Sequence, residues 1–250
     1  MHVIRVAILA LLPWLLSGNA QAAVRQQFTV QTPSGAILVE SFATGASEPR
    51  PPVIILSGSK GFGSSAYDEI GQTLSATGLD AYLVHVLSAA DLDAITRFAS
   101  ARARIGYYEK RLSDWTAAVQ GAVSYLNARP HHGGKVGMLG ISLGAQIAAA
   151  AAVNSVDIGA LVLVDGGFPN GYSQPIRSLP PLQLIWGGGD LVFPPSVGRE
   201  LHRMAQGLGG PASLDVYEGE PHDFFLKSGT RQAHAAHQSA ADFLVSQSSR

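Results

Sequence analysis

The chain has 250 residues, a formal net charge of −1 and no cysteine. The small net charge gives no field that would draw the protein to nucleic acid, and the missing thiols exclude cysteine nucleophiles and cysteine-based metal sites. Charged residues make up 14% of the chain and hydrophobic residues 46%, which favours a sheet that is buried on both faces.

The first 22 residues have the organisation of an export signal. Arg5 supplies a positive charge, residues 6–16 form an apolar run, and Ala20-Gln21-Ala22 matches the small-x-small pattern that signal peptidase recognises. The run is shorter than the roughly 20 apolar residues that a transmembrane helix needs. We expect cleavage after Ala22, a periplasmic or secreted protein with one domain over residues 23–250, and no membrane association after cleavage. An uncleaved membrane anchor is the alternative, and the pattern indicates no oligomeric state.

Two alternating segments, residues 27–31 and 36–40, are joined by a turn rich in Pro and Gly and predict an antiparallel hairpin. Thereafter short apolar runs alternate with longer helical segments, which predicts an α/β fold: a mostly parallel twisted sheet with helices on both faces. The predicted strands cover residues 53–56, 81–87, 136–139, 160–164, 182–186 and 214–217. The predicted helices cover residues 66–76, about 91–128, 144–152, 199–206 and 233–245.

The segment from Asp91 to Asp114 is rich in basic residues, and a solvated helical face explains it best. Attraction of anionic substrates is the alternative. Tyr107 and Tyr108 would cover an active site if this segment folded over one, and the sequence leaves that question open.

Gly140-Ile141-Ser142-Leu143-Gly144 matches the G-x-S-x-G pattern. A hydroxyl is a poor nucleophile at neutral pH and needs an adjacent base. In this pattern the glycines permit a sharp strand-to-helix turn that exposes the serine. Ser142 follows an apolar run and precedes an alanine-rich helix, so the setting favours a nucleophile over a serine that only caps the helix.

A base and an acid should follow in the order Ser, Asp or Glu, His, each after a later strand. Asp190 follows the predicted strand 182–186, and His222 follows the predicted strand 214–217. In an open α/β sheet the carboxyl ends of the strands are the edge where ligands bind. Asp165, at the end of the predicted strand 160–164, is the alternative acid.

Four blocks resemble the α/β-hydrolase superfamily, and within it the dienelactone-hydrolase-like family: Leu56 to Gly63, Leu139 to Gly144, Trp186 to Asp190, and Glu220 to Phe224. The resemblance implies the α/β-hydrolase fold over the whole mature chain. It implies Ser142 as nucleophile, His222 as general base and then acid, and Asp190 as the group that orients the imidazole. Dienelactone hydrolases proper carry a Cys nucleophile, so Ser142 points away from that particular substrate.

The family position of the first block implies that the backbone N–H of Ser59 stabilises the oxyanion, with Lys60 as the alternative. The N–H of Leu143, directly after the nucleophile, is the expected second donor. Aromatic and aliphatic residues on loops near the same edge are the expected substrate pocket, namely Phe62, Ile141, Phe168, Tyr172 and Phe193.

These features predict a serine hydrolase that cleaves carboxylic esters of small substrates through an acyl-enzyme, with no cofactor and no metal. Thioesters or lactones could be cleaved by the same mechanism, and a non-catalytic binding protein on this scaffold is the alternative of another class. Gly61 to Ala66 formally matches a dinucleotide-binding loop, but Asp80 stands at the wrong end of the next strand to bind a ribose. His234 and His237 share a helix face without a further ligand and are expected to be solvated.

Overall fold

The computed structural model describes residues 25–42 and 48–248, so the predicted export signal lies outside the described residues. Within them, the strands form one sheet in the order β1-β2-β4-β3-β5-β6-β7-β8. Their bounds are β1 (Gln26–Thr32), β2 (Gly35–Ser41), β3 (Pro52–Leu56), β4 (Asp80–Val84), β5 (Val136–Ile141), β6 (Ile158–Val164), β7 (Leu182–Gly187) and β8 (Ala212–Tyr217). β3 to β8 pair in parallel, whereas β1 and β2 form an antiparallel hairpin that joins β4. The predicted mostly parallel sheet and its hairpin are confirmed.

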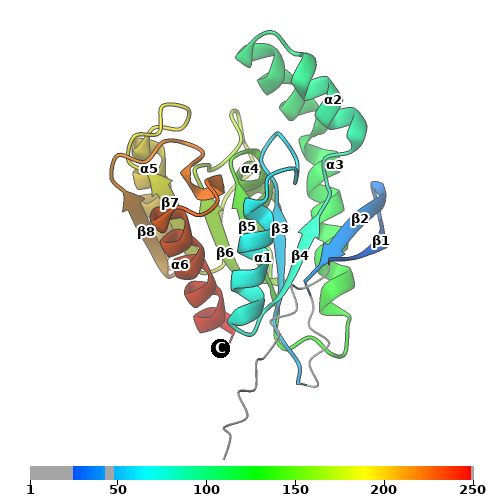
Figure 1. Cartoon of the computed structure of the whole chain (residues 1–250). Helices are drawn as coiled ribbons and strands as arrows, with labels where there is room; N and C mark the ends of the chain where they lie inside the picture. Colours follow the sequence, from blue (N-terminus) through cyan, green and yellow to red (C-terminus); the bar gives the residue numbers. More distant parts are fainter. Residues whose placement is uncertain (1–24, 43–47, 249–250) are drawn as a thin grey trace, which may run out of the picture.

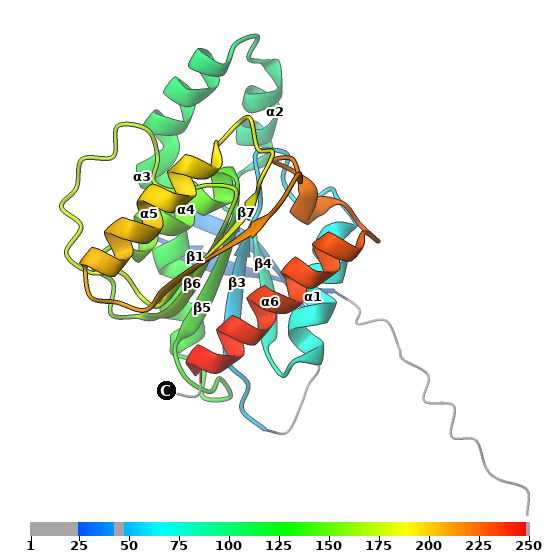
Figure 2. The ribbon, with the colours of Figure 1, turned by 90° about the vertical axis from the view of Figure 1, so that its left-hand side faces the viewer.

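Helices cover both faces of the sheet (Figure 2). Their bounds are α1 (Ala66–Ala76), α2 (Ala89–Arg97), α3 (Ala101–Asn127), α4 (Leu143–Ala152), α5 (Pro195–Gly207), the short 3₁₀ helix η1 (Phe224–Leu226) and α6 (Arg231–Ser248). α1 and α6 lie on one face, and α3, α4 and α5 lie on the other. Across residues 25–42 and 48–248, the helices are too short or too polar to span a bilayer.

The core divides into two layers because successive side chains of a strand point to opposite faces of the sheet. Val53 and Ile55 of β3 belong to the layer beneath α1 and α6, and Ile54 and Leu56 belong to the layer beneath α3 and α4. All four side chains are fully buried. Each such aliphatic side chain contributes roughly 1.5–3 kcal/mol through burial, which explains why the central strands read as continuous apolar runs.

The prediction of one helix from about residue 91 to 128 was wrong, because the chain breaks into α2 and α3. Phe98 adopts an extended conformation, with φ −69° and ψ 122°. The Ser88 side chain accepts from the N–H of Asp91 at 3.1 Å, and Ser100 caps α3 in the same way. Serine favours helix starts because its hydroxyl replaces a missing backbone acceptor. The charged and apolar pattern continues through the break without a Gly or Pro, so it carried no stop signal.

α3 is longer than the sheet that it crosses. Its 27 residues extend about 40 Å, whereas strands of five to seven residues extend roughly 20 Å. The buried side chains of α3 all lie from Trp115 onward. Its first half therefore extends past the carboxyl edge of the sheet, with α2 beside it (Figure 1). We call α2 and the first half of α3 the helical hairpin.

His85, His234 and His237 each have a side-chain or backbone partner, and one of them departs from expectation. His85 directly follows β4, and its ring bonds to the Glu40 carboxylate at 2.6 Å. His237 is only 2% exposed, and its Nε2 bonds to the carbonyl oxygen of Phe225 at 2.8 Å. The expectation of a solvated His234 and His237 pair was therefore wrong for His237, because α6 turns that side chain toward η1. His234 is exposed and pairs with Glu69.

Candidate active site

Ser142 occupies a sharp turn between β5 and α4. Its backbone has φ +53° and ψ −112°, a conformation that residues with a side chain rarely adopt. Both glycines of the motif are sterically required here. A Cβ on Gly140 would lie 2.4 Å from the carbonyl oxygen of Gly144, and a Cβ on Gly144 would lie 2.3 Å from that of Leu56. The close helix–strand contact thus explains the G-x-S-x-G spacing and holds the serine at the end of its strand.

Three side chains from distant parts of the chain form a continuous series of hydrogen bonds. Ser142 Oγ lies 2.9 Å from His222 Nε2, and His222 Nδ1 lies 2.8 Å from Asp190 Oδ2. Because an ionised carboxylate can only accept, Nδ1 carries the imidazole proton and Nε2 accepts from the serine hydroxyl. The three residues stand after β5, β7 and β8, at the carboxyl edge of the sheet, as the sequence predicted.

The Asp190 carboxylate is held firmly by its own loop. Its Oδ1 accepts from the backbone N–H groups of Val192 at 2.7 Å and Phe193 at 2.9 Å. The residue is only 2% exposed. These two bonds fix the carboxylate so that its other oxygen faces the imidazole, and the ring of Phe193 packs against His222 with centroids 5.6 Å apart.

Asp165, the alternative acid, does not contact the imidazole through a hydrogen bond. Its Oδ1 accepts from the N–H of Gly187 at 2.8 Å, and its Oδ2 has no hydrogen-bond partner within the described residues. The carboxyl is completely buried, and this burial, with the nearby charges of Asp190 and Asp223, raises its pKa to about 8. Asp165 therefore holds its proton to a higher pH than an ordinary aspartate does.

Asp165, Asp190 and His222 also form the group in the described residues whose ligand atoms gather most like a metal site, all within 4.8 Å of one another. The ligand atoms of Asp190 and His222 are already engaged, however. The Asp190 and His222 atoms bond to each other, and Asp190 Oδ1 accepts two backbone N–H groups. The arrangement fits a hydrogen-bonded acid–base group better than a set of ligands that converge on a cation.

Ser142 and His222 line two clefts. The smaller, of about 360 Å³, is lined by the glycine-rich loop after β3, including Ser59 and Lys60, and by Ile141. The larger, of about 530 Å³, lies between α3 and the loops after β6 and β7. Both volumes are in the range of small-molecule sites. Ser59 lines both clefts, and Leu143 lines the larger.

The predicted pocket residues divide between these clefts and their surroundings. Ile141 lines the smaller cleft, and Phe168 and Phe193 line the larger. Phe62 lies outside both, and its ring packs 4.8 Å from the ring centroids of Tyr67 and His85. Tyr172 also lies outside both and packs against Phe168.

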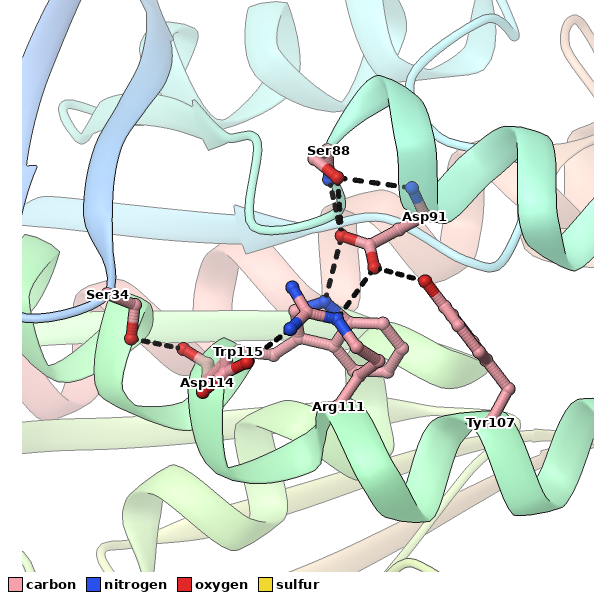
Figure 3. A network of polar contacts seen from close by, with 7 residues as sticks. All are labelled: Ser34, Ser88, Asp91, Tyr107, Arg111, Asp114 and Trp115. Atoms are coloured by element: carbon pink, nitrogen blue, oxygen red, sulfur yellow. Dashed lines mark hydrogen bonds and ion pairs between the residues drawn. The ribbon is translucent and has the colours of Figure 1, made fainter.

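The helical hairpin is tied together by Asp91, which Figure 3 shows at the centre of a polar network. Its carboxylate accepts from Tyr107 at 2.7 Å, Arg111 at 2.9 Å, Trp115 at 3.2 Å, and the hydroxyl and N–H of Ser88. Burial alone would raise the pKa of Asp91, but the hydrogen bonds from Arg111, Tyr107 and Ser88 outweigh it and hold that pKa well below its usual value. The prediction of a solvated face was therefore wrong at Asp91, which is 2% exposed.

Of the two tyrosines considered as a cover, only Tyr108 lies over the site. It lines the larger cleft together with Ser59, Ser142 and His222. Tyr107 instead packs inside the hairpin against Asp91. Half of the hypothesis is thus supported by the structure: α3 forms one wall of the site through Tyr108.

Comparison with the sequence models of known families shows which family the chain belongs to. The sequence model of the dienelactone hydrolase family matches residues 39–246, which include the three hydrogen-bonded side chains. The chain belongs to the dienelactone hydrolase family. It is thus a dienelactone-hydrolase-like enzyme with the α/β-hydrolase fold, as the resemblance implied. A search of curated proteins gave no match.

Solved structures similar to this dienelactone hydrolase family member share its fold at low sequence identity. Dienelactone hydrolase from Anabaena variabilis is 19% identical, with 89% of this chain and 98% of that chain covered and a TM-score of 0.70. An esterase from Pyrobaculum calidifontis is 15% identical, with coverage of 89% and 85% and a TM-score of 0.68. Esterase 2 from Thermogutta terrifontis, phosphorylated by paraoxon, is 14% identical, with coverage of 89% and 94% and a TM-score of 0.67.

Sequence reasoning missed most of the wall that α3 contributes to this family member. Ile105, Leu112 and Trp115 line the larger cleft with Tyr108. Their spacing of three, four and three residues places them on one helix face, and that periodicity was a usable signal. Apart from the hypothesis about Tyr107 and Tyr108, the segment was interpreted through its charges, and the periodicity was overlooked.

Proposed function

We propose that the protein hydrolyses carboxylic esters of small molecules, with Ser142 as nucleophile, His222 as base and Asp190 as the group that orients the imidazole. The single observation that carries this proposal is the hydrogen-bond series from Ser142 Oγ through His222 to Asp190, at 2.9 and 2.8 Å. A nucleophile, a base within reach and a third group that orients the base are the parts that acyl transfer requires.

In the proposed mechanism His222 Nε2 takes the proton of Ser142 as Oγ attacks the ester carbonyl carbon. The oxyanion is held by the backbone N–H groups of Ser59 and Leu143. Leu143 is the first residue of α4, so its N–H has no partner within the helix and lies where the helix dipole favours negative charge. The imidazolium then gives its proton to the departing alcohol. A water molecule, deprotonated by His222, releases the acid and restores Ser142.

Labelling with a fluorophosphonate or paraoxon tests the assignment directly, because an activated serine displaces fluoride from the first or nitrophenolate from the second and keeps the phosphorus group. We expect the wild type to be labelled at Ser142 and Ser142→Ala to be unlabelled. Unlabelled wild type, or equal labelling of Ser142→Ala, would instead favour a non-catalytic binding protein. Ser142→Ala and His222→Ala should each lower kcat on a short nitrophenyl ester by a factor on the order of 10⁶.

The same steps would cleave thioesters and lactones, since both present an acyl carbon to the serine. Ser142 stands where the family resemblance implies cysteine, and this supports ordinary esters over dienelactones as substrates. A matched set of an ester, a thioester and a lactone with one acyl group would rank them by kcat/KM. We also propose export and cleavage after Ala22, from the signal-like residues 1–22.

A further inference from the structure

Large apolar side chains are concentrated at the mouth of the larger cleft. Six large hydrophobic residues are exposed within the described part of the chain, and four of them lie here. Ile105, Val192 and Val197 line the cleft and are 39%, 63% and 36% exposed, and Leu191, 94% exposed, adjoins Val192. Single exposed apolar residues are ordinary, but a cluster of them beside a cleft marks a binding surface.

One wall of the cleft is an apolar stripe on α3. Ile105, Tyr108, Leu112 and Trp115 follow one another at intervals of three or four residues, so they share the helix face that looks into the cleft. Trp115 is buried at the inner end of the stripe, and Ile105 is exposed at its outer end. The stripe therefore leads from the mouth of the cleft toward its floor.

The opposite wall comes from the loops after β6 and β7 and includes Phe168 and Phe193. Two hydrogen bonds fix the backbone of Phe193. Its N–H donates to the Asp190 carboxylate, and its carbonyl oxygen accepts from the Trp186 indole N–H at 2.8 Å. Because the same loop holds Asp190, this wall keeps a constant position relative to His222. The charged lining residues are Arg104 and Glu109, one of each sign, so the cleft has no net charge to select an anion.

We propose that the larger cleft binds an extended or bulky apolar group on one side of the scissile ester, so that the preferred substrates are esters of longer chains or aromatic groups. This inference rests on the proposed function and specifies its substrate class. Ser142 and His222 line both clefts, so an ester bound at Ser142 places one side in each. The smaller, glycine-rich cleft then takes the other side of the ester.

Two ester series test this class of substrate and distinguish the two sides of the bond. One series varies the acyl chain from acetate to decanoate with a nitrophenyl leaving group, and the other varies the alcohol of an acetate ester over the same lengths. In one of the series we expect kcat/KM to rise by up to about fourfold per methylene group until the cleft is filled, the value that corresponds to burial of a CH₂. Values that stay flat or fall in both series would overturn the proposal.

Two exposed valines provide a test of the cleft and its control. Val192 is 63% exposed at the cleft, and Val156 is 75% exposed before β6, at the opposite edge of the sheet. Both tolerate a polar side chain without loss of core packing. Val192→Asn should lower kcat/KM for the longest good substrate by about three- to tenfold relative to the shortest, whereas Val156→Asn should leave that ratio unchanged. An unchanged ratio in Val192→Asn would count against the cleft.

The two proposals fail in different ways. If esters are cleaved and Ser142 is labelled while chain length has no effect, the hydrolase assignment stands and the apolar substrate class is wrong. If Ser142 is not labelled and no ester is cleaved, the proposed function is wrong, and with it the substrate class.

Discussion

Asp165 and Asp190 end neighbouring strands, and both carboxyls lie close to the His222 ring. Asp190 receives three hydrogen bonds, one of them from the ring. Asp165 receives one and is otherwise enclosed. The two carboxyls thus differ in their surroundings: Asp190 has three donors, whereas Asp165 has one and its burial raises its pKa.

Replacing each aspartate by asparagine should separate their roles in the reaction. Asp190→Asn presents a donor to Nδ1 and favours the wrong imidazole tautomer, so we expect kcat on a nitrophenyl ester to fall by about 10⁴. Asp165→Asn keeps the bond from Gly187 and should change kcat by less than about tenfold. Steady-state kinetics measures kcat for both variants. A large loss of kcat in Asp165→Asn together with an active Asp190→Asn would show that Asp165, not Asp190, orients the imidazole.

Asp165 should also affect stability in a pH-dependent way. Its pKa is raised from 3.8 to about 8 on folding, so between these pH values the folded state keeps a proton that the unfolded state has lost. The unfolding free energy therefore falls as pH rises through this window, by up to about 1.4 kcal/mol per pH unit from this group. In urea unfolding at pH 5 and pH 8, Asp165→Asn should lose less stability between the two pH values than the wild type. An equal loss in both proteins would show that Asp165 does not carry the effect.

At the scale of elements, one buried carboxylate joins the two helices of the helical hairpin. Tyr107, Arg111 and Trp115 on α3 all donate to Asp91 at the start of α2. The hairpin in turn supplies the α3 wall of the larger cleft. A contact remote from Ser142 is thus expected to control the shape of the substrate site.

Removing the Asp91 carboxylate should destabilise the protein, and a substitution of the neighbouring Asp93 provides the control. Asp91→Ala leaves a buried indole N–H and a tyrosine hydroxyl without their acceptor, and we expect it to lower the unfolding free energy by about 2–3 kcal/mol. Asp93→Ala breaks only an exposed pair with Arg97 and should cost less than about 0.5 kcal/mol. Urea denaturation measures both. Because the pKa of Asp91 is lowered on folding, its contribution is present above the unfolded value of 3.8 and should be lost as pH falls below it.

For the whole molecule, the sequence predicted the sheet and the order of Ser142, Asp190 and His222, since strands buried on both faces form plain apolar runs and their carboxyl ends meet at one edge. It did not predict the break before Ser100, which depends on hydroxyl caps, or the packing of Tyr108 over the site. The raised pKa of Asp165 could not be predicted from the sequence either. Burial and neighbouring charge come from tertiary structure, which local patterns do not encode.

Export is a prediction about the whole chain. Mass spectrometry of the exported protein should find an N-terminus at Ala23, because Ala20 and Ala22 are the small residues that the peptidase requires. Ala22→Leu should instead accumulate the precursor. A wild-type protein that keeps Met1 and stays with the membrane would favour the uncleaved anchor.

The hydrogen bond between Ser142 and His222 joins residues 80 positions apart, and that between Asp190 and His222 joins residues 32 apart. Contacts over such separations form late in folding because the entropy of closing the intervening loops must first be overcome, whereas helices form locally within microseconds. Circular dichroism should therefore recover before ester hydrolysis when the unfolded protein is diluted out of denaturant. The time at which ester hydrolysis recovers would then report when the sheet is complete through β8.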